Sequence, residues 1–143
     1  MKPRLMSLGF QAIMFTATTG MAMARTAPAP AAAAPEALVL HFDLGSTAVR
    51  EQDRAVLDQA SRLYRDGHPV VMIVSGSADS VGSPESNLLI SQQRAATVLR
   101  GLVARGIPAE RFQLLAKGET DPVVPARQGI AQAENRRVEI RWR

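Results

Sequence analysis

The chain has 143 residues, which is enough for one domain and a leader segment, and it contains no cysteine, so disulfides are excluded. Lys2 and Arg4 are two of its 17 basic residues, and the other 15, with 13 acidic residues, give the rest of the chain a net charge of +2. Because acids and bases alternate along that part, without a basic face interleaved with aromatic residues, no nucleic acid partner is expected.

The first predicted element is a secretory signal peptide over residues 1–24. Two basic residues open it, an uncharged and largely apolar run follows from Leu5 to Phe15, and the small-x-small sequence AMA at residues 22–24 predicts cleavage after residue 24. The alternative is a retained membrane anchor, but the apolar run is short, and diluted by Thr, Gly and Gln, for the roughly 30 Å of hydrocarbon that it would cross. Without a cysteine at the cleavage point, the chain is not expected to be a lipoprotein.

The Ala/Pro-rich residues 25–37 predict a flexible, extended linker, because this composition cannot bury a core and its prolines interrupt any helix. We expect one folded domain over residues 38–143, which is soluble once released. Its first elements are a strand over residues 38–42 and a helix over residues 50–69. Apolar residues recur on one face of that helix at helical spacing, namely Val56, Leu57, Ala60, Leu63 and Tyr64. Gly67 is expected to end the helix, with a proline soon after to prevent its return.

A second strand and a second helix follow. Residues 70–75, VVMIVS, form an unbroken apolar run, which predicts a strand buried on both faces. The helix is expected to begin at Ser83-Pro84-Glu85, which supplies a capping hydroxyl, a proline in the first turn and an acid near the positive end of the helix dipole. It should run to about residue 105, where Gly106 stops it. Its inward side chains are predicted to be Leu88, Ala95, Val98, Leu99 and Leu102.

Two further strands are predicted over residues 111–117 and 136–143, joined by a loop with one short helical turn over residues 118–135. In the last strand, charged residues alternate with the apolar residues Val138, Ile140 and Trp142, which indicates one buried and one solvent-facing side. The order of elements is therefore β-α-β-α-β-(short α)-β. It predicts an α/β fold, a small two-layer sandwich in which two main helices cover one face of a mixed sheet.

The turn between the second strand and the second helix holds a lone acid, Asp79, and the helix after it carries Arg94. A carboxylate binds an ammonium group, and a guanidinium binds a carboxylate through parallel hydrogen bonds. Held a fixed distance apart, the two side chains suit a ligand that carries both charges, such as the head group of an amino acid. The spacing alone favours a simpler alternative, an intramolecular salt bridge that pins the turn to the helix.

Several short motifs follow one another along the predicted domain. They are HFDLGSTAV at residues 41–49, Gly76-Ser77-Ala78-Asp79, Gly82, Asn87, Ile90-Ser91-Gln92-Gln93-Arg94-Ala95 and Asn135-Arg136-Arg137-Val138-Glu139. No single motif is specific, but in this order and spacing they resemble the peptidoglycan-binding domain family that is similar to the C-terminal domain of outer membrane protein A (OmpA). The resemblance covers residues 38–143.

The resemblance implies a function, the noncovalent binding of cell-wall peptidoglycan at the free end of diaminopimelate in the stem peptide. In the resembling family the turn Asp binds the ammonium group of that end and the helix Arg binds its carboxylate, and these positions match Asp79 and Arg94. The other residues implied at the peptidoglycan-binding site are Asn87, Asp43 and Phe42, and those implied to support it are Gly76, Gly82 and Arg137. The resemblance implies no cofactor and no metal.

The turn departs from the family pattern, and this keeps a second function open. Ser77 and Ala78 stand where the family usually has His and Thr, and Ser86 stands where it often has an aromatic residue. The lost His and Thr would have supplied polar contacts that orient the turn. The alternative is an envelope protein–protein interaction module that kept the fold but lost peptidoglycan binding.

An enzyme is the alternative from a third class. Ser77, His68 and Asp79 are close in sequence, but the Gly-x-Ser-x-Gly turn typical of many hydrolases is missing, and His68 is expected at the surface before a proline. With two histidines and no cysteine, a metal site is not expected either. We therefore expect a binding protein and not an enzyme.

The expected location follows from the signal peptide and the implied ligand. A secreted domain that binds the wall implies the periplasm of a Gram-negative-type envelope, where it would anchor an envelope component to the wall. Any association with the outer membrane is expected to come through a partner, such as an outer-membrane or envelope protein complex.

Overall fold

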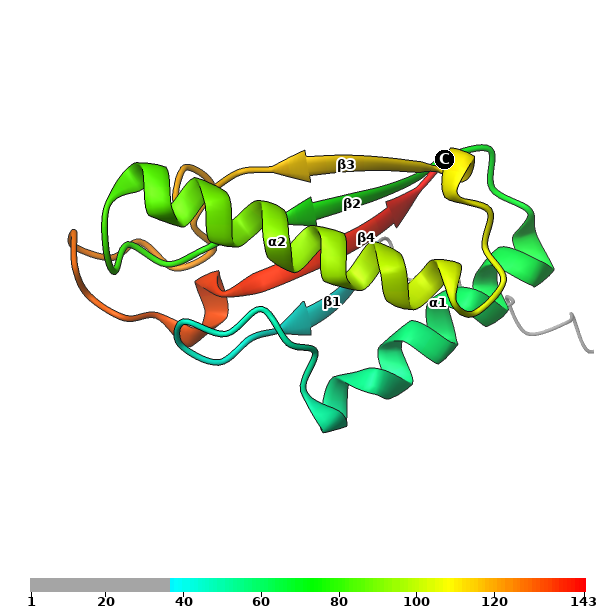
Figure 1. The fold of residues 1–143 in the computed structure, drawn as a ribbon, viewed down its shortest axis with the longest axis horizontal. Helices are drawn as coiled ribbons and strands as arrows, with labels where there is room; N and C mark the ends of the chain where they lie inside the picture. Colours follow the sequence, from blue (N-terminus) through cyan, green and yellow to red (C-terminus); the bar gives the residue numbers. More distant parts are fainter. Residues whose placement is uncertain (1–36) are drawn as a thin grey trace, which may run out of the picture. The chain divides into compact units, whose positions relative to one another are not determined.

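The computed structural model describes residues 37–143, so the predicted signal peptide and nearly all of the predicted linker lie outside the described residues. The described chain forms a four-stranded sheet and two main helices (Figure 1). The strands are β1 (Leu38–His41), β2 (Met72–Gly76), β3 (Phe112–Ala116) and β4 (Arg137–Trp142). The helices are α1 (Arg54–Gly67) and α2 (Pro84–Val103), and single 3-10 turns occupy Glu51–Asp53, Ala109–Arg111 and Ala133–Asn135.

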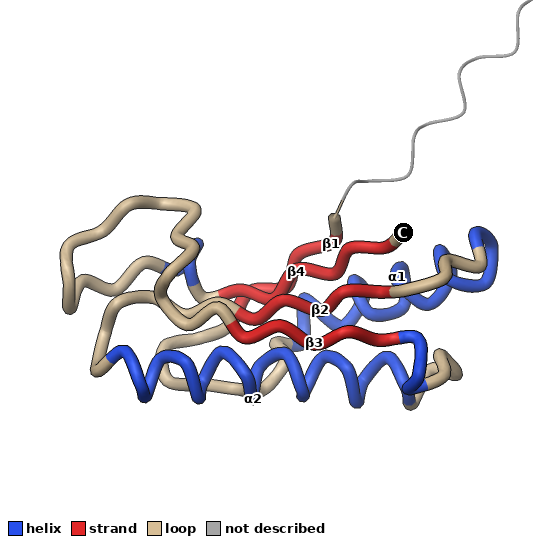
Figure 2. The backbone as a smooth tube through the Cα atoms, turned by 90° about the horizontal axis from the view of Figure 1, so that it is seen from above, coloured by secondary structure: helices blue, strands red, loops and turns tan. Residues whose placement is uncertain are grey.

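The sheet is mixed, with the strand order β1-β4-β2-β3. β4 lies between β1 and β2 and is antiparallel to both, whereas β2 and β3 are parallel and are connected through α2. Figures 1 and 2 show both helices on the same face of the sheet. This arrangement confirms the predicted two-layer α/β sandwich with a mixed sheet and two main helices.

The core lies between the helices and the covered face of the sheet. Alternate strand residues point into it, as the period of two in a strand requires. The fully buried strand residues are Leu40, Met72, Val74, Val138 and Ile140, and they meet Leu57, Ala60, Ala95, Val98 and Leu102 of the helices. Trp142 packs against this core, as its place in the alternating strand predicts.

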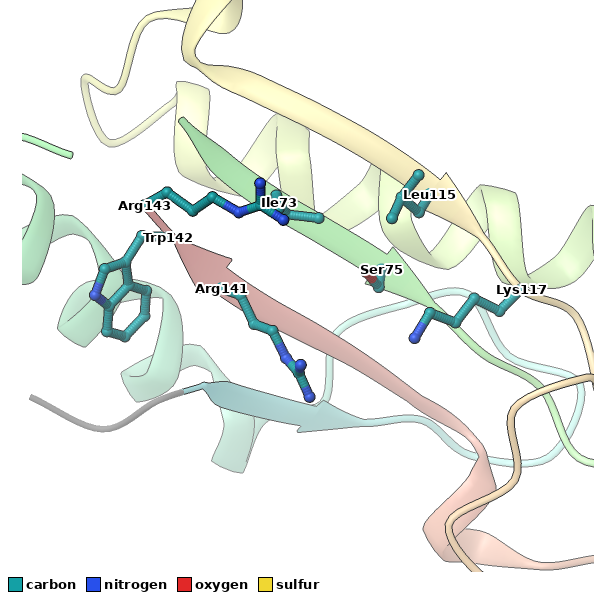
Figure 3. Close-up of a pocket in the computed structure, with 7 residues that line it drawn as sticks. All are labelled: Ile73, Ser75, Leu115, Lys117, Arg141, Trp142 and Arg143. Atoms are coloured by element: carbon teal, nitrogen blue, oxygen red, sulfur yellow. The ribbon is translucent and has the colours of Figure 1, made fainter. Parts of the chain in front are cut away.

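The opposite face of the sheet is open, and here the structure differs from the prediction for β2. The apolar run was expected to be buried on both faces, but Val70 lies before the strand and is 68% exposed, and Ile73 is only partly covered. No helix among the described residues covers this side. A hollow of about 310 Å³ lies on this open face (Figure 3), lined by Ile73, Ser75, Leu115, Lys117, Arg141, Trp142 and Arg143.

The helix ends are mostly as predicted. Ser83 caps α2, because its hydroxyl accepts a hydrogen bond from the Ser86 N–H at 3.1 Å, and Gly106 takes a left-handed conformation with φ +94° after α2. Gly67 is the last residue of α1, as predicted, and the residue after it, His68, takes the left-handed conformation with φ 45°. None of the helices over residues 37–143 is both long and apolar enough to cross a membrane.

Leu88 in the first turns of α2 was expected to point inward, but its side chain is 49% exposed. The helix begins beside the loop that follows β3, and the backbone of Leu88 lies against Gly118 of that loop. An ideal Cβ on Gly118 would lie 3.3 Å from the backbone of Leu88. The first turns of α2 therefore pack through their backbone and leave an apolar side chain in solvent.

Candidate ligand-binding site

The residues predicted to form a site come together at one end of the sheet. β1, β2 and β3 end there and β4 begins there, so three loops meet, at the left of Figure 1. These loops cover residues 42–50, 77–83 and 117–136, and the first half of α2 runs alongside. The topology therefore gathers motifs that are separated by almost a hundred residues.

Gly76, the last residue of β2, brings α2 close to this end. An ideal Cβ on Gly76 would lie 2.0 Å from the carbonyl oxygen of Ser91, a distance that no real side chain tolerates. Only glycine therefore allows the helix backbone to pack directly on the strand. Arg94 lies one turn further along α2 and points into the loops beyond the strand end.

Arg94 is almost completely buried, with 1% of its surface exposed. Its guanidinium donates to three backbone carbonyl oxygens, through Nε to Ser46 at 2.9 Å, Nη1 to Ser77 at 3.3 Å and Nη2 to Asp43 at 3.2 Å. Its Cζ lies 5.3 Å from the centre of the Phe42 ring, which is a cation–π contact. Phe42 and Arg94 thus hold each other in the buried base of the site.

The positive charge of Arg94 has no direct counter-ion among residues 37–143, because none of the ion pairs there includes it. The pKa of Arg94 is lowered to about 10, mainly because the guanidinium is buried. The negative charge of Asp79 raises this pKa, and the positive charge of Arg136 lowers it. Arg94 remains charged at neutral pH. Three of its five N–H donors are bound to carbonyl oxygens, which leaves two for a ligand.

Asp79 is also buried, with 5% exposed, and its carboxylate is bound within the protein. Its Oδ2 accepts hydrogen bonds from Arg136 Nη1 at 2.9 Å and from the Gln132 N–H at 3.3 Å. Its Oδ1 accepts one long hydrogen bond, from the Val81 N–H at 3.4 Å. Arg136 in turn donates from Nε to the Phe42 carbonyl oxygen at 3.0 Å, so it is fixed on both sides.

The simpler alternative for Asp79 and Arg94, a salt bridge between them, is not found among the described residues. Asp79 forms its ion pair with Arg136 instead. Sequence reasoning missed this residue, although it lies inside the quoted motif before Arg137. No sequence signal pairs the two residues, because Arg136 precedes β4 and lies 57 positions after Asp79, so only the fold brings them together.

The other predicted site residues surround this charged centre. Asn87 is buried, and its Nδ2 donates to Glu119 at 2.6 Å. Asp43 is exposed and contributes its carbonyl oxygen to Arg94, while its side chain faces solvent. Gly82 takes φ +94° in the turn before α2, a conformation that favours glycine. Glu119 was not predicted as a partner of Asn87, because it lies 32 residues later in the sequence, in the loop after β3.

Arg137 was predicted to support the site. Its side chain lies on the open face of the sheet, beside Glu139. Its Nε donates to Glu139 at 2.8 Å, and both its Nη atoms donate to the Asp121 carbonyl oxygen. Its own carbonyl oxygen accepts from the Ser77 N–H at 2.8 Å. Arg137 therefore ties the loop after β3 to the sheet and makes no side-chain contact with Asp79 or Arg94.

The residues considered for catalysis and for metal binding are not assembled. His68 precedes β2 whereas Ser77 and Asp79 follow it, so the strand separates them. Groups of three or more His, Asp or Glu residues that could hold a metal ion do not occur within residues 37–143.

The fold and the site define a class of small α/β domains with a mixed four-stranded sheet. Within it, the OmpA family model matches residues 41–136, about two thirds of the chain, so this chain belongs to the OmpA family. Outer membrane protein A of Bordetella avium is 33% identical over 99 residues, which cover 69% of this chain and 51% of that protein. The peptidoglycan-associated lipoprotein of Pseudomonas putida is 32% identical over 102 residues, which cover 71% and 60%.

A solved structure shows the same fold. The crystal structure of the peptidoglycan-associated lipoprotein from Burkholderia pseudomallei matches with a TM-score of 0.68 and 27% identity, over 73% of this chain and 89% of that one. The periplasmic domain of Helicobacter pylori MotB matches in fold, with a TM-score of 0.61 and 19% identity. The chain spans only 51% to 60% of the two curated relatives described above.

Proposed function

We propose that the domain over residues 38–143 binds peptidoglycan noncovalently and anchors an envelope component to the cell wall. The observation that carries this proposal is the buried guanidinium of Arg94, which is surrounded by neutral carbonyl oxygens and lacks a carboxylate partner among the described residues. A buried charge is unfavourable unless it is paired, so this site favours an anionic group. The carboxylate at the end of a stem peptide is such a group.

The ligand proposed within peptidoglycan is the free end of diaminopimelate. Arg94 would bind its carboxylate with the two remaining N–H donors, and Asp79 would face its ammonium group. Phe42, Asp43 and Asn87 would line the same end of the sheet. Two relatives named as peptidoglycan-associated lipoproteins support the choice of polymer, one by sequence and one by structure.

The place of action proposed is the periplasm, with any outer-membrane association made through a partner in an envelope complex. Relatives named as an outer membrane protein and as lipoproteins support an envelope location. We propose a binding role without catalysis and without a cofactor.

A second candidate function is a protein–protein interaction module that retains the fold without binding the wall. Two observations favour it. Ser77 and Ala78 replace the His and Thr usual in the family, and Asp79 and Arg94 are both almost fully buried. A ligand would have to enter between the surrounding loops to reach them.

Sedimentation with purified peptidoglycan sacculi tests the proposed function. The protein should sediment with the wall, and Arg94→Gln should remain largely in solution because it loses the charge that binds the carboxylate. The matched control is Arg141→Gln, which removes the same charge from an exposed position on the open face (Figure 3). Arg141→Gln should sediment like the unmodified protein.

Circular dichroism and a thermal melt of each variant show whether it is folded at the temperature of the assay. Equal sedimentation of folded Arg94→Gln and the unmodified protein would contradict the role of Arg94. No sedimentation of the unmodified protein would contradict peptidoglycan binding and favour the interaction module.

A further inference from the structure

Three charged side chains share the buried end of the sheet, and their charges do not cancel. Arg94 and Arg136 are positive and Asp79 is negative, so the cluster has a net charge of +1 at neutral pH. Arg136 donates to Asp79 and to the Phe42 carbonyl oxygen, and the Phe42 ring contacts Arg94, so the three charged groups lie around one residue. The fields of Asp79 and Arg136 both act on the pKa of Arg94. The cluster therefore has one uncompensated cation and no uncompensated anion.

Arg136 compensates Asp79 and is held there from both ends. Its Nη1 donates to Asp79 at 2.9 Å, and its Nε donates to the Phe42 carbonyl oxygen at 3.0 Å. The backbone of Arg136 is fixed to the same residue, because its carbonyl oxygen accepts the Phe42 N–H at 2.8 Å. Displacing this guanidinium would break both of these side-chain hydrogen bonds, to Asp79 and to the Phe42 carbonyl oxygen.

An incoming ammonium group would therefore find most of the Asp79 carboxylate occupied. Oδ2 already accepts from Arg136 and from the Gln132 N–H. Oδ1 has room for a further donor, since it accepts only a long bond from the Val81 N–H. The positive charge of the nearby Arg136 would also repel an ammonium group. An incoming carboxylate would find Arg94 without a counter-ion among the described residues and with two N–H donors still available.

We infer that the site selects its ligand by the carboxylate, and that Arg136 is a specificity-determining residue which makes the ammonium group secondary. This inference rests on the proposed function. The ligand class is then a stem peptide with a free terminal carboxylate beside either a free or a blocked amine. Amidation of the carboxylate excludes a peptide from this class, whereas acylation of the amine does not.

Titration calorimetry of the full chain with three synthetic tripeptides tests the inference. The peptides are L-Ala–γ-D-Glu–meso-diaminopimelate, the same peptide amidated at the carboxylate of the free end, and the same peptide acetylated at the amine of that end. Amidation should weaken binding by about tenfold or more, and acetylation by less than about threefold.

The outcomes separate the inference from the function on which it rests. Equal losses on amidation and acetylation would overturn the inference and leave the proposed function standing. No binding of the unmodified peptide would overturn both. These measurements use the unmodified protein, so they do not depend on the folding of a variant.

Variants at position 136 distinguish a role in specificity from a role in the fold, because only a role in specificity changes the ratios of affinity among the three peptides. In Arg136→Gln the carboxylate of Asp79 loses its compensating charge, so the acetylation penalty should rise to about tenfold. In Arg136→Lys the charge is kept, and the penalty should stay small. A uniform loss of affinity for all three peptides in Arg136→Gln, with no change in their ratios, would show that Arg136 only supports the fold.

Discussion

At the scale of single residues, two buried charges at the site differ in whether they have a counter-ion. The carboxylate of Asp79 pairs with an arginine and accepts hydrogen bonds from backbone N–H groups, whereas the guanidinium of Arg94 contacts only carbonyl oxygens and an aromatic ring. The sequence singled out Asp79 and Arg94 by their opposite charges on either side of the turn and by the family resemblance, and their role in binding stays a prediction. The sequence could not predict Arg136 as the partner of Asp79, since the two lie 57 residues apart and only the fold joins them.

The ion pair between Asp79 and Arg136 predicts a loss of stability when the acid is neutralised. Asp79→Asn keeps an acceptor for the Gln132 N–H but leaves Arg136 largely buried without a counter-ion. We expect the free energy of unfolding, measured with urea, to fall by roughly 3 kcal/mol. The matched change Asp43→Asn, at an exposed side chain, should alter it by less than about 0.5 kcal/mol. Equal stability of the two variants would contradict the ion pair.

At the scale of elements, the contact of α2 with the end of β2 decides where Arg94 points. Apolar patterning predicted both helices and all four strands, through a regular period in α1 and β4 and through an unbroken apolar run in β2. The prediction that Leu88 points inward was wrong, because an apolar pattern does not indicate where the sheet ends beneath the helix. The end of α1 at Gly67 was predicted correctly, although His68 after it is the residue that takes the left-handed conformation.

The close approach of α2 to β2 predicts the effect of one methyl group. Gly76→Ala would place a Cβ 2.0 Å from the Ser91 carbonyl oxygen, so the helix must move away from the strand. Urea unfolding should show a loss of about 3 kcal/mol or more. Gly67→Ala is the control, because its Cβ would meet no atom within 4 Å and alanine favours a helix. An equally small effect of both changes would refute the packing described for α2.

At the scale of the whole domain, the sheet has two unlike faces, and the proposed binding site lies at one of its ends. The helices cover one face, and the open face carries charged side chains that bind one another. Glu139 is bound by Arg137 at 2.8 Å and by Arg141 at 3.0 Å, which places a buried carboxylate on the face predicted to be solvent-exposed. The alternation of apolar and charged residues in β4 predicted which side of the sheet Arg137, Glu139 and Arg141 face. It did not predict that Arg137 and Glu139 are buried, because their burial depends on the loop after β3.

The carboxyl groups of the folded domain predict how its stability depends on pH. Hydrogen bonds from Arg105 and Lys117 lower the pKa of Asp58 and of Asp121, respectively. Burial by itself would raise the pKa of Glu139, but the hydrogen bond from Arg137 and the nearby positive charges outweigh it and lower the pKa. The unfolded chain therefore binds more protons than the folded one in mild acid, and stability is lost as the pH falls.

Urea unfolding at a series of pH values measures this effect. The free energy of unfolding should be near its maximum above about pH 5 and should fall steadily toward about pH 2.5. Glu139→Gln should reduce the slope, because one of the contributing carboxyl groups is gone. A slope that is unchanged in this variant would show that Glu139 is not stabilised as a carboxylate in the folded domain.

The most direct test of the central claim is to locate the bound ligand by NMR. The claim is that a stem peptide binds at the end of the sheet, beside the buried guanidinium of Arg94. A titration of ¹⁵N-labelled protein with the diaminopimelate tripeptide should shift the Arg94 Nε–H signal and the backbone signals of residues 42–46, 77–82 and 132–136. Shifts confined to the open face, around Ile73, Leu115 and Arg141, would contradict it, as would a spectrum that does not change.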